Sequence, residues 1–323
     1  MATIRYGDDV FELAQDESVL DGLTRQGIAI PSGCRSGICQ TCIMRALHGT
    51  PPAAAQQDLT GHQRQQGCFL SCICYPQHDM QVALPDDAPA RLSATVARVE
   101  RLSADILQVT LHCHADFRYR PGQFINLHRN ETLSRSYSLA SVPELDEGLH
   151  LHVKRIAQGK VSAWVHDELE PGLQIEIQGA MGDCYYTPDD KHQALLLVGT
   201  GSGLAPLYGI VRDALHQGHR GEIRLYHGSR GIGGLYLLDE LRALQEQYAN
   251  FSYFPCLSQQ TLSGFRSGRA HDLALADRPD LKNWKVFLCG HPGMVNSTRK
   301  KSFLAGAAFQ DIHADAFVVA QQT

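Results

Sequence analysis

The sequence predicts a multidomain protein that combines α+β and α/β architecture, and three observations support this. Its 323 residues exceed what one ordinary hydrophobic core accommodates. The segment PDDAPARL at residues 85–92 places two prolines and two aspartates between apolar strands, which is typical of a domain boundary. The hydrophobic period later changes from strand alternation to alternating strands and helices. We therefore expect three domains, at residues 1–88, 89–190 and 191–323.

Composition excludes several classes of protein. Hydrophobic residues make up 43% of the chain and charged residues 20%, which is typical of a soluble globular protein. The net charge of -5 gives no basic footprint for nucleic acid. The opening stretch MATIRYGDDVFELAQDES has no apolar core of an export signal, and no segment approaches the ~18 apolar residues of a membrane helix. We expect a cytoplasmic monomer that binds neither nucleic acid nor membrane.

The cysteines are unevenly spaced, and this predicts a metal centre. Cys34, Cys39 and Cys42 have the spacing C-x4-C-x2-C, which is the plant-type 2Fe-2S arrangement once a distant fourth thiolate joins it. In the segment CFLSCIC, Cys72 stands at the chain distance expected for that ligand, and Cys68 and Cys74 are the alternatives. A structural zinc site is a further alternative, but zinc ribbons favour two close C-x2-C pairs and only one exists here.

The segments around these cysteines predict a small α+β domain. Residues 2–12 resemble a strand, a turn and a strand, residues 16–27 a capped amphipathic helix ending at Gly27, and MQVALP a closing strand. Gly33 and Gly37 suit a loop that wraps tightly around a cluster and needs unusual backbone dihedrals. The order of elements resembles the β-grasp fold of plant-type ferredoxins over residues 1–85. Gln40 stands where many relatives carry a small residue.

The second domain is predicted to be an antiparallel β-barrel. Five segments alternate apolar and polar residues at barrel-like spacing. A single short helix is expected in GKVSAWVHDEL, where Val161, Val165 and Leu169 form an apolar stripe. The five strand segments are SATVARVERL, ILQVTLHCH, QFINLHR, LHLHVKRI and LQIEIQG.

One further strand of this domain, RSYSLAS from Arg135 onward, combines side chains suited to a cofactor. It offers a cation for a pyrophosphate, an aromatic ring for stacking, and hydroxyls for a heterocycle nitrogen. Taken alone, the pattern also fits an exposed strand of mixed polar residues.

The third domain is predicted to be a parallel α/β sheet that binds a nucleotide. ALLLVGTGSGLAPLYGIVRDALHQG resembles a buried strand, a glycine-rich turn and a helix, the unit that cradles a pyrophosphate. Its glycines follow G-x-G-x-G, and a tight structural turn is the alternative. Further strands are expected in EIRLYHGS, FSYFPCLS and WKVFLCG, with helices in LYLLDELRALQEQ and after CGHPGM.

Taken together, these motifs resemble the ferredoxin-NADP reductase superfamily. PGQF, RSYS, VKR, GKVS, GTGSGLAP and CGHPGM stand in the order that this superfamily has them. With the cysteine loop at the N-terminus, the chain resembles the reductase components of bacterial multicomponent oxygenases over nearly its whole length. The resemblance implies a β-grasp 2Fe-2S ferredoxin domain, a flavin-binding β-barrel and a Rossmann-like nucleotide-binding domain.

The resemblance also implies roles for individual residues. In the barrel, Arg135 would pair with the FAD phosphate, Tyr137 would lie against the isoalloxazine ring and Ser138 would approach its N5 atom. Ser138 and Cys289 would flank the reaction. The remaining residues implied in FAD binding are Lys154, Gly159, Val161, Ser162 and the C-terminal aromatic Phe317, for which a core phenylalanine is the alternative.

The nucleotide-binding residues follow in the same way. The glycine-rich turn would hold the NAD(P)H pyrophosphate through Gly199, Thr200, Gly201 and Gly203. Cys289 and Gly290 would border the nicotinamide, with Met294 on the following helix as a further cofactor-binding residue. A small buried side chain is the alternative for Cys289. Ser229 and Arg230 could accommodate a 2′-phosphate, which favours NADPH, whereas the resemblance favours NADH.

These parts predict one electron-transfer chain. Nicotinamide gives up two electrons as a hydride and a 2Fe-2S cluster accepts one at a time, so a flavin between them is required. We expect an NAD(P)H-dependent reductase that passes electrons through FAD and the cluster to a terminal oxygenase or another redox protein. The alternatives are a free-standing reductase of quinones or ferric chelates, and a redox-sensing binding module.

Two histidine pairs are weighed as metal ligands. His112 and His114, and likewise His150 and His152, lie two residues apart on predicted strands, so each pair shares one face. No third ligand is evident near either pair. We expect solvated or hydrogen-bonding histidines, and packing roles for Cys113, Cys184 and Cys256.

Overall fold

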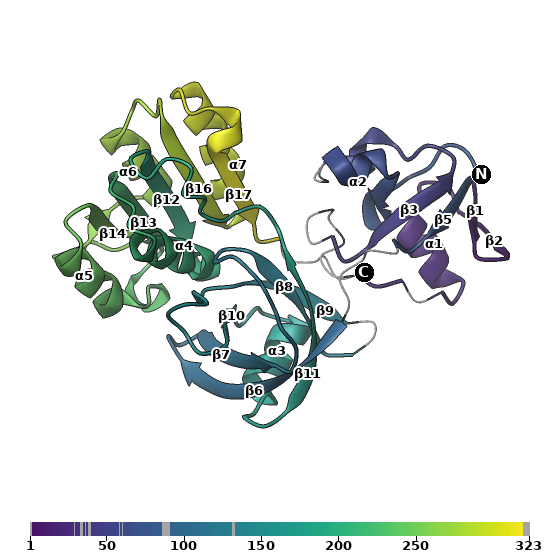
Figure 1. Cartoon of the computed structure of the whole chain (residues 1–323), viewed down its shortest axis with the longest axis horizontal. Helices are drawn as coiled ribbons and strands as arrows, with labels where there is room; N and C mark the ends of the chain where they lie inside the picture. The colour runs from purple at the N-terminus through teal and green to yellow at the C-terminus, as the bar shows by residue number, and fades with distance from the viewer. Residues whose placement is uncertain are drawn as a thin grey trace.

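Three β-sheets follow one another along the chain (Figure 1). The computed structural model describes residues 2–28, 30–32, 35, 37, 40–57, 59, 61–85, 91–130 and 133–318. Its sheets are a five-stranded mixed sheet, a six-stranded antiparallel sheet and a six-stranded parallel sheet. Figure 1 shows the N-terminal sheet to one side of the other two, which lie one above the other. The predicted fold class is confirmed.

The N-terminal sheet has the strand order β2-β1-β5-β3-β4 and packs against a short helix, α1 (Val19–Arg25). The Ser18 hydroxyl accepts a hydrogen bond from the Asp21 amide at 3.1 Å, which caps the start of this helix. Gly27, with a φ of +89°, follows its end, as the sequence predicts. The strands are β1 (Thr3–Tyr6), β2 (Asp9–Glu12), β3 (Ile43–His48), β4 (Cys68–Leu70) and β5 (Met80–Ala83).

Three single-turn elements connect β3 to β5 and complete this domain. They are η1 (Ala53–Gln56), α2 (Gly61–Gln65) and η2 (Ser71–Ile73). The apolar side chains of α1, β4 and η2 share one core with those of β1 and β5. The linker residues 86–90, on which the first predicted domain boundary falls, lie outside the described residues.

The second sheet forms the predicted barrel, with the order β10-β7-β6-β11-β8-β9. A bridge between Leu139, just beyond β9, and Leu151 in β10 joins the two edges. Helix α3 (Lys160–Asp167) follows β10, and its Val161 and Val165 pack into the barrel core. The strands are β6 (Arg91–Arg101), β7 (Ile106–Cys113), β8 (Phe124–His128), β9 (Ser134–Ser138), β10 (Leu149–Lys154) and β11 (Gln174–Met181).

The third sheet is parallel, with the order β15-β14-β13-β12-β16-β17. Its strands are β12 (Ala194–Thr200), β13 (Ile223–Ser229), β14 (Phe251–Leu257), β15 (Arg266–Ser267), β16 (Trp284–Gly290) and β17 (Ile312–Ala316). Its helical segments are η3 (Gly201–Gly203), α4 (Leu204–His216), η4 (Ile232–Gly234), α5 (Leu238–Gln247), α6 (Ala270–Asp277), α7 (Pro292–Leu304) and η5 (Phe309–Asp311).

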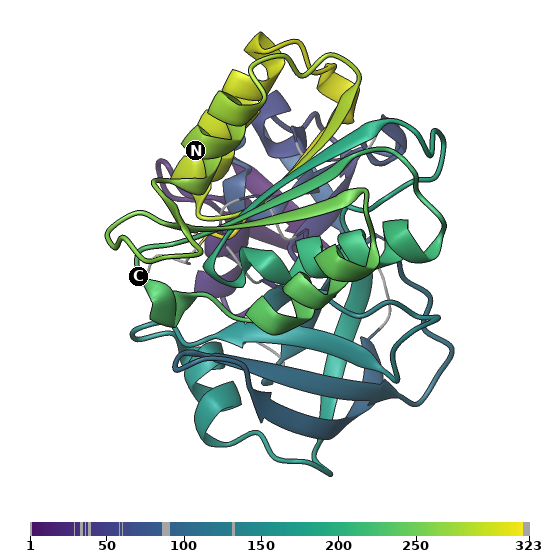
Figure 2. The ribbon, with the colours of Figure 1, turned by 90° about the vertical axis from the view of Figure 1, so that its left-hand side faces the viewer.

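Helices cover both faces of this sheet, and Figure 2 shows them on its two sides above the barrel. Side chains of α4 and α5 fill one hydrophobic core, and those of α6 and α7 fill the other. The strand order reverses at β12, so the carboxyl ends of β12 and β16 diverge into a crevice where nucleotides bind in such sheets. The two glycine motifs, at the ends of β12 and β16, therefore meet at this point.

Candidate redox site

Cys42, the last cysteine of the predicted cluster loop, lies beside the predicted fourth ligand. Both the backbone amide and the hydroxyl of Ser71 donate hydrogen bonds to the carbonyl oxygen of Cys42, at 3.1 and 2.8 Å. These bonds hold Cys42 against η2, whose central residue is Cys72. Both thiols are buried. Two of the four predicted ligands thus lie on neighbouring segments, while Cys34 and Cys39 lie outside the described residues.

The backbone of the loop has the dihedrals that the sequence predicts. Gly37 has a φ of +80°, and Arg35 and Gln40 have φ values of +54° each. A side chain at Gly37 would collide with the side chain of Ile73, so the loop passes directly over η2. Glycine is required at that position by both its dihedral and its surroundings. Gly33 is outside the described residues.

The two alternative ligands are also buried, on either side of Cys72. Cys68 lies on β4, and Cys74 follows η2, where its carbonyl oxygen accepts a hydrogen bond from the Val19 amide at the start of α1. Burial raises the pKa of the Cys74 thiol to about 12. Because the Ser71 hydrogen bonds place η2 directly against Cys42, Cys72 remains our predicted fourth ligand.

Strand β9 brings the predicted flavin residues to the edge of the barrel. The Arg135 guanidinium is half-buried and donates a hydrogen bond to the Ser134 carbonyl at 2.7 Å. The ring of Tyr137 packs on the barrel core, and burial raises the pKa of its hydroxyl. The Ser138 hydroxyl donates to a carboxylate oxygen of Asp315, 3.2 Å away on β17 of the parallel sheet. The barrel strand therefore meets the nucleotide-binding sheet at Ser138.

The N-terminus of α3 is shaped by its own polar groups. Gly159 occupies the N-cap position. The Ser162 hydroxyl accepts a hydrogen bond from the Ile156 amide at 3.1 Å and donates one to the Gly159 carbonyl at 3.2 Å. The Val161 side chain belongs to the barrel core, so only its backbone amide is suited to an anion. The turn can thus present amides to a pyrophosphate, with Ser162 fixing its shape.

The two glycine motifs of the parallel sheet are in direct contact. A methyl group on Gly203 would collide with the carbonyl oxygen of Cys289, and one on Gly290 would collide with Thr200. The His291 amide donates a hydrogen bond to the Thr200 hydroxyl at 3.2 Å. Gly199 is similarly close to the first turn of α4. These glycines are needed because backbone meets backbone at the crevice.

Lysine and glycine from different sheets also meet here. The Lys154 ammonium, on β10, pairs with Asp105 at 3.2 Å. It would lie 3.6 Å from a methyl group placed on Gly201, so the barrel lysine stands beside the glycine-rich turn. Gly201 has a φ of +56°, a backbone conformation that favours glycine. The predicted FAD and NAD(P)H residues therefore converge on one region.

Asp315 is the site residue that sequence analysis missed. It lies on β17, opposite Cys289 on β16, and it accepts the hydrogen bond of Ser138. Burial raises the pKa of its carboxyl group to about 6, against the lowering effect of the Ser138 hydrogen bond. The only sequence signal was an acidic residue two positions before Phe317, in a segment too short and polar to indicate a strand.

Cys289 is enclosed at the end of β16. Its sulfur lies 3.7 Å from that of Cys184, and burial raises the pKa of the Cys289 thiol well above its ordinary range. A thiol in this state is a weak nucleophile, which fits a packing or positioning role rather than covalent catalysis. Cys184 and Cys256 are buried and Cys113 packs on the barrel core, in agreement with the packing roles predicted for them.

The other predicted residues fall into three places. The Phe317 amide donates to the Gly290 carbonyl at 2.8 Å, so this half-buried aromatic lies next to the second glycine motif. Met294 packs in the core beneath α7. Ser229 ends β13, and the exposed Arg230 follows it at the loop where the Gln260 side chain accepts a hydrogen bond from Ile232.

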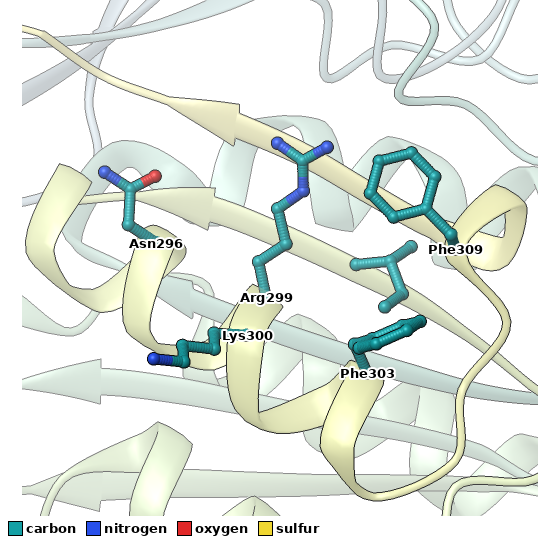
Figure 3. A pocket seen from close by; sticks show the side chains of 6 residues that line it. Asn296, Arg299, Lys300, Phe303 and Phe309 are labelled. Atoms are coloured by element: carbon teal, nitrogen blue, oxygen red, sulfur yellow. The ribbon is translucent and has the colours of Figure 1, made fainter.

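A separate hollow of about 340 Å³ lies on α7 (Figure 3). The predicted metal and cofactor residues do not line it. Figure 3 shows Arg299 beside Phe309, and the guanidinium carbon lies 5.1 Å from the centre of that ring. The lining residues are Asn296, Arg299, Lys300, Phe303, Phe309 and Ile312.

The next residues are the two histidine pairs that were weighed as metal ligands. Within the described ranges, no group of three or more His, Cys, Asp or Glu side chains could hold a metal ion. His114 lies 2.6 Å from the Thr95 hydroxyl, and His152 lies 3.2 Å from the Tyr236 hydroxyl. The hydrogen-bonding role is confirmed for these two, although His152 is buried and not solvated.

No helix of the described chain is long and apolar enough to cross a membrane.

The geometry defines a class of protein: an oxidoreductase with a cysteine-rich centre, a barrel for a flavin and a parallel sheet for a dinucleotide. Family models match each part. Residues 5–77 match the 2Fe-2S iron-sulfur cluster binding domain, residues 93–186 the oxidoreductase FAD-binding domain and residues 197–300 the oxidoreductase NAD-binding domain. Each match lies inside one of the three predicted domains.

Relatives match the chain over nearly its whole length and theirs. The chain is 32% identical over 316 residues to the reductase subunit of an aromatic O-demethylase from an Amycolatopsis species, covering 94% of this chain and 95% of that protein. It is 30% identical to the phenol hydroxylase P5 protein of Acinetobacter pittii, covering 96% and 92%. The crystal structure of Amycolatopsis cytochrome P450 reductase GcoB is 30% identical and superposes with a TM-score of 0.73, covering 99% of this chain and 100% of that one.

The chain therefore belongs to the ferredoxin-NADP reductase superfamily, in the family of oxygenase reductase components with an N-terminal 2Fe-2S domain. It is an NAD(P)H-dependent flavin iron-sulfur oxidoreductase, and its cofactors are a 2Fe-2S cluster, FAD and NAD(P)H. It transfers electrons from NAD(P)H through FAD to the cluster.

Proposed function

We propose that this chain is the reductase component of a multicomponent oxygenase and delivers electrons from NADH to a terminal oxygenase. One relative named above is the reductase subunit of an aromatic O-demethylase and another is a phenol hydroxylase protein, which supports this partner class. The observation that carries the proposal is the contact of Ser138 with Asp315 beside Cys289, in a chain that also carries the cysteine loop. It joins the flavin barrel to the dinucleotide sheet where hydride transfer would occur.

The proposal assigns the binding residues as follows. FAD, when bound, accepts a hydride from nicotinamide and can release its electrons singly to the cluster. Arg135 and the amides at the start of α3 hold its phosphates, and Tyr137 and Ser138 hold its ring. The cluster is held by Cys34, Cys39, Cys42 and Cys72. The domain boundaries that we propose are residues 1–88, 89–190 and 191–323.

On the nucleotide side, the glycine-rich turn receives the dinucleotide phosphates. The backbone of Gly203 lies directly against the backbone of Cys289, which keeps this turn close to the nicotinamide end of the crevice. Cys289 is buried and helps to exclude water from the flavin edge, and the hydrogen bond from the Ser138 hydroxyl to the half-buried Asp315 bridges the two domains. Arg230 is exposed just after β13, where the 2′-phosphate of NADPH would lie. We nevertheless propose NADH as the preferred coenzyme.

The partner and cellular setting complete the proposal. We infer a cytoplasmic monomer whose acceptor is a protein, and no nucleic acid ligand. Figure 1 shows the N-terminal domain to one side of the nucleotide-binding sheet, so an acceptor can approach the N-terminal domain without blocking NADH.

The test compares two acceptors in one protein. Ferricyanide takes electrons directly from reduced flavins, whereas cytochrome c serves as a one-electron protein acceptor for the cluster. We expect Cys72→Ser to retain NADH:ferricyanide activity and to lose most cytochrome c reduction, with Cys113→Ser as the matched control. Equal cytochrome c rates in wild type and Cys72→Ser would show that electrons leave from the flavin, as in a free-standing reductase.

A further inference from the structure

A buried hydrogen bond crosses from the barrel to the nucleotide-binding domain, away from Ser138. His152 on β10 and Tyr236, in the segment between η4 and α5, are both almost completely buried. The His152 Nδ1 atom lies 3.2 Å from the Tyr236 hydroxyl, and the two rings meet edge to face with centroids 5.4 Å apart. A polar contact with so little exposure is costly to leave unsatisfied. It therefore fixes how these two domains meet.

The same tyrosine continues the contact towards the glycine-rich turn. The ring of His227, on β13, meets the Tyr236 ring at 90° with centroids 5.6 Å apart. The His227 Nδ1 atom lies 3.3 Å from the Tyr253 hydroxyl, and its ring stands beside the Gly201 backbone. His152, Tyr236 and His227 thus form a continuous strut, from a barrel strand to the turn at the end of β12.

The strut is uncharged. Burial lowers the pKa of His152 and of His227 to about 3 each, and it raises the pKa of the Tyr236 hydroxyl. Neutral imidazoles and a neutral phenol form directional hydrogen bonds in a dry environment without the desolvation cost of an ion. Because these groups are neutral and buried, salt screens this contact little.

A second barrel residue reaches the same turn from the same strand. His152 and Lys154 are two residues apart on β10, so their side chains share the face opposite the barrel core. Lys154, paired with Asp105, lies beside Gly201 from the barrel side, while His227 lies beside it from the sheet side. The turn therefore lies between Lys154 of β10 and His227 of β13, and His227 is linked to β10 through Tyr236 and His152.

We propose that His152, Tyr236 and His227 are positioning residues for hydride transfer, which hold the glycine-rich turn at a fixed place relative to the flavin barrel. The inference rests on the proposed function, in which that turn binds the dinucleotide. A small displacement of reacting atoms lowers the rate of transfer strongly while affecting binding little, because most of the coenzyme contacts are retained. The strut should accordingly influence the transfer step more than coenzyme affinity.

The test uses the full-length protein loaded with FAD and its cluster. Tyr236→Phe removes one hydroxyl and keeps the ring, and Tyr208→Phe is the matched control, because the Tyr208 ring lies near His152 at 6.4 Å but its hydroxyl is outside the strut. We expect Tyr236→Phe to lower the limiting rate of flavin reduction by NADH by about fivefold to tenfold, the effect of one buried hydrogen bond. The apparent Kd for NADH should change less than twofold, and Tyr208→Phe should match wild type.

A spectroscopic signal separates positioning from stability. Nicotinamide stacked on flavin gives a long-wavelength charge-transfer band whose intensity depends on their relative placement. We expect this band to weaken in Tyr236→Phe while FAD content stays at the wild-type value. An unchanged rate and band, accompanied only by a lower melting temperature, would overturn the proposal and leave the strut as interface packing.

A second pair of variants decides the question should Tyr236→Phe fail to fold. His152→Asn places an amide where Nδ1 lies and should preserve the rate and band, whereas His152→Leu should lower both. Equal behaviour of these two variants would overturn the proposal. If NADH does not reduce the flavin of the wild-type protein, the proposed function fails; if it does and the variants match wild type, only the positioning role fails.

Discussion

Replacing Gly203 with alanine isolates the contact between the two glycine motifs. Gly203 has φ and ψ of -62° and -10°, which alanine adopts readily, so the change introduces no backbone strain. The added methyl group would collide with the carbonyl oxygen of Cys289 and approach the Cα of Gly290. Both are backbone atoms, so neither can swing aside as a flexible side chain would.

The size of the effect follows from this collision. Overpacking of a well-packed site destabilises the folded protein by about 1–3 kcal/mol. Replacing glycine by alanine at a compatible position stabilises it by about 0.4–1 kcal/mol, because alanine lowers the conformational entropy of the unfolded chain. If the protein relieves the collision by moving the turn away from Cys289, the dinucleotide site opens. A loss of about 1.4 kcal/mol in binding corresponds to a tenfold weaker Kd for NADH.

The assay is an NADH titration of flavin reduction under anaerobic conditions, with thermal unfolding measured in parallel. Gly233→Ala is the matched control, since a methyl group there meets no other atom. We expect Gly203→Ala to bind NADH about tenfold more weakly, and the control to resemble wild type. Wild-type affinity together with wild-type stability in Gly203→Ala would refute the close approach of the two motifs.

Three further substitutions test separate parts of the site. Cys72→Ser should abolish the absorbance bands of the cluster and leave flavin reduction intact, whereas Cys74→Ser should keep the cluster; the reverse pattern would identify Cys74 as the ligand. Arg135→Ala should lower the FAD content of the purified protein, with Arg98→Ala, an exposed arginine of β6, as the control, and full FAD occupancy would remove Arg135 from the phosphate site. Asp315→Asn should raise the melting temperature at pH 8 but not at pH 4. The folded-state pKa of Asp315 is raised to about 6, so its ionisation destabilises the fold as the pH rises from about 4 to about 6, and the penalty persists above that window. An identical melting temperature of Asp315→Asn and wild type at pH 8 would contradict the raised pKa of this half-buried carboxyl group.

Local patterns were sufficient to predict most of the fold. The hydrophobic pattern of consecutive residues predicts nine of the strands. Alternation of apolar and polar residues predicts β6, β7, β8, β10 and β11, and short apolar runs predict β12, β13, β14 and β16. Helix α1 was predicted as a capped amphipathic helix ending at Gly27, and the structure shows that Ser18 is its cap. Strand β17 and helix α6 were missed, because short, mixed segments become a strand or helix only through packing on their neighbours.

The site was predictable in its motifs but not in its contacts. The glycines of GTGSG and CGH were recognised one motif at a time. Any side chain at Gly203 would collide with the backbone of Cys289, and this contact exists only because β12 and β16 are neighbouring strands. Asp315 joins Ser138 only because β17 extends the sheet past Cys289. His152, predicted as a surface or hydrogen-bonding histidine, is buried because the nucleotide-binding domain covers that face of β10. Residues far apart in the chain carry no joint signal in a single sequence.

The central claim is that electrons pass from NADH through FAD to a 2Fe-2S cluster within this one chain. The most direct measurement is the visible spectrum of the purified protein during anaerobic titration with NADH, and separately with NADPH. We predict flavin and cluster bands that bleach in succession at near-stoichiometric NADH, with NADPH required in excess. A protein that shows flavin bands alone, or cluster bands that NADH leaves unchanged after the flavin is reduced, would contradict the account.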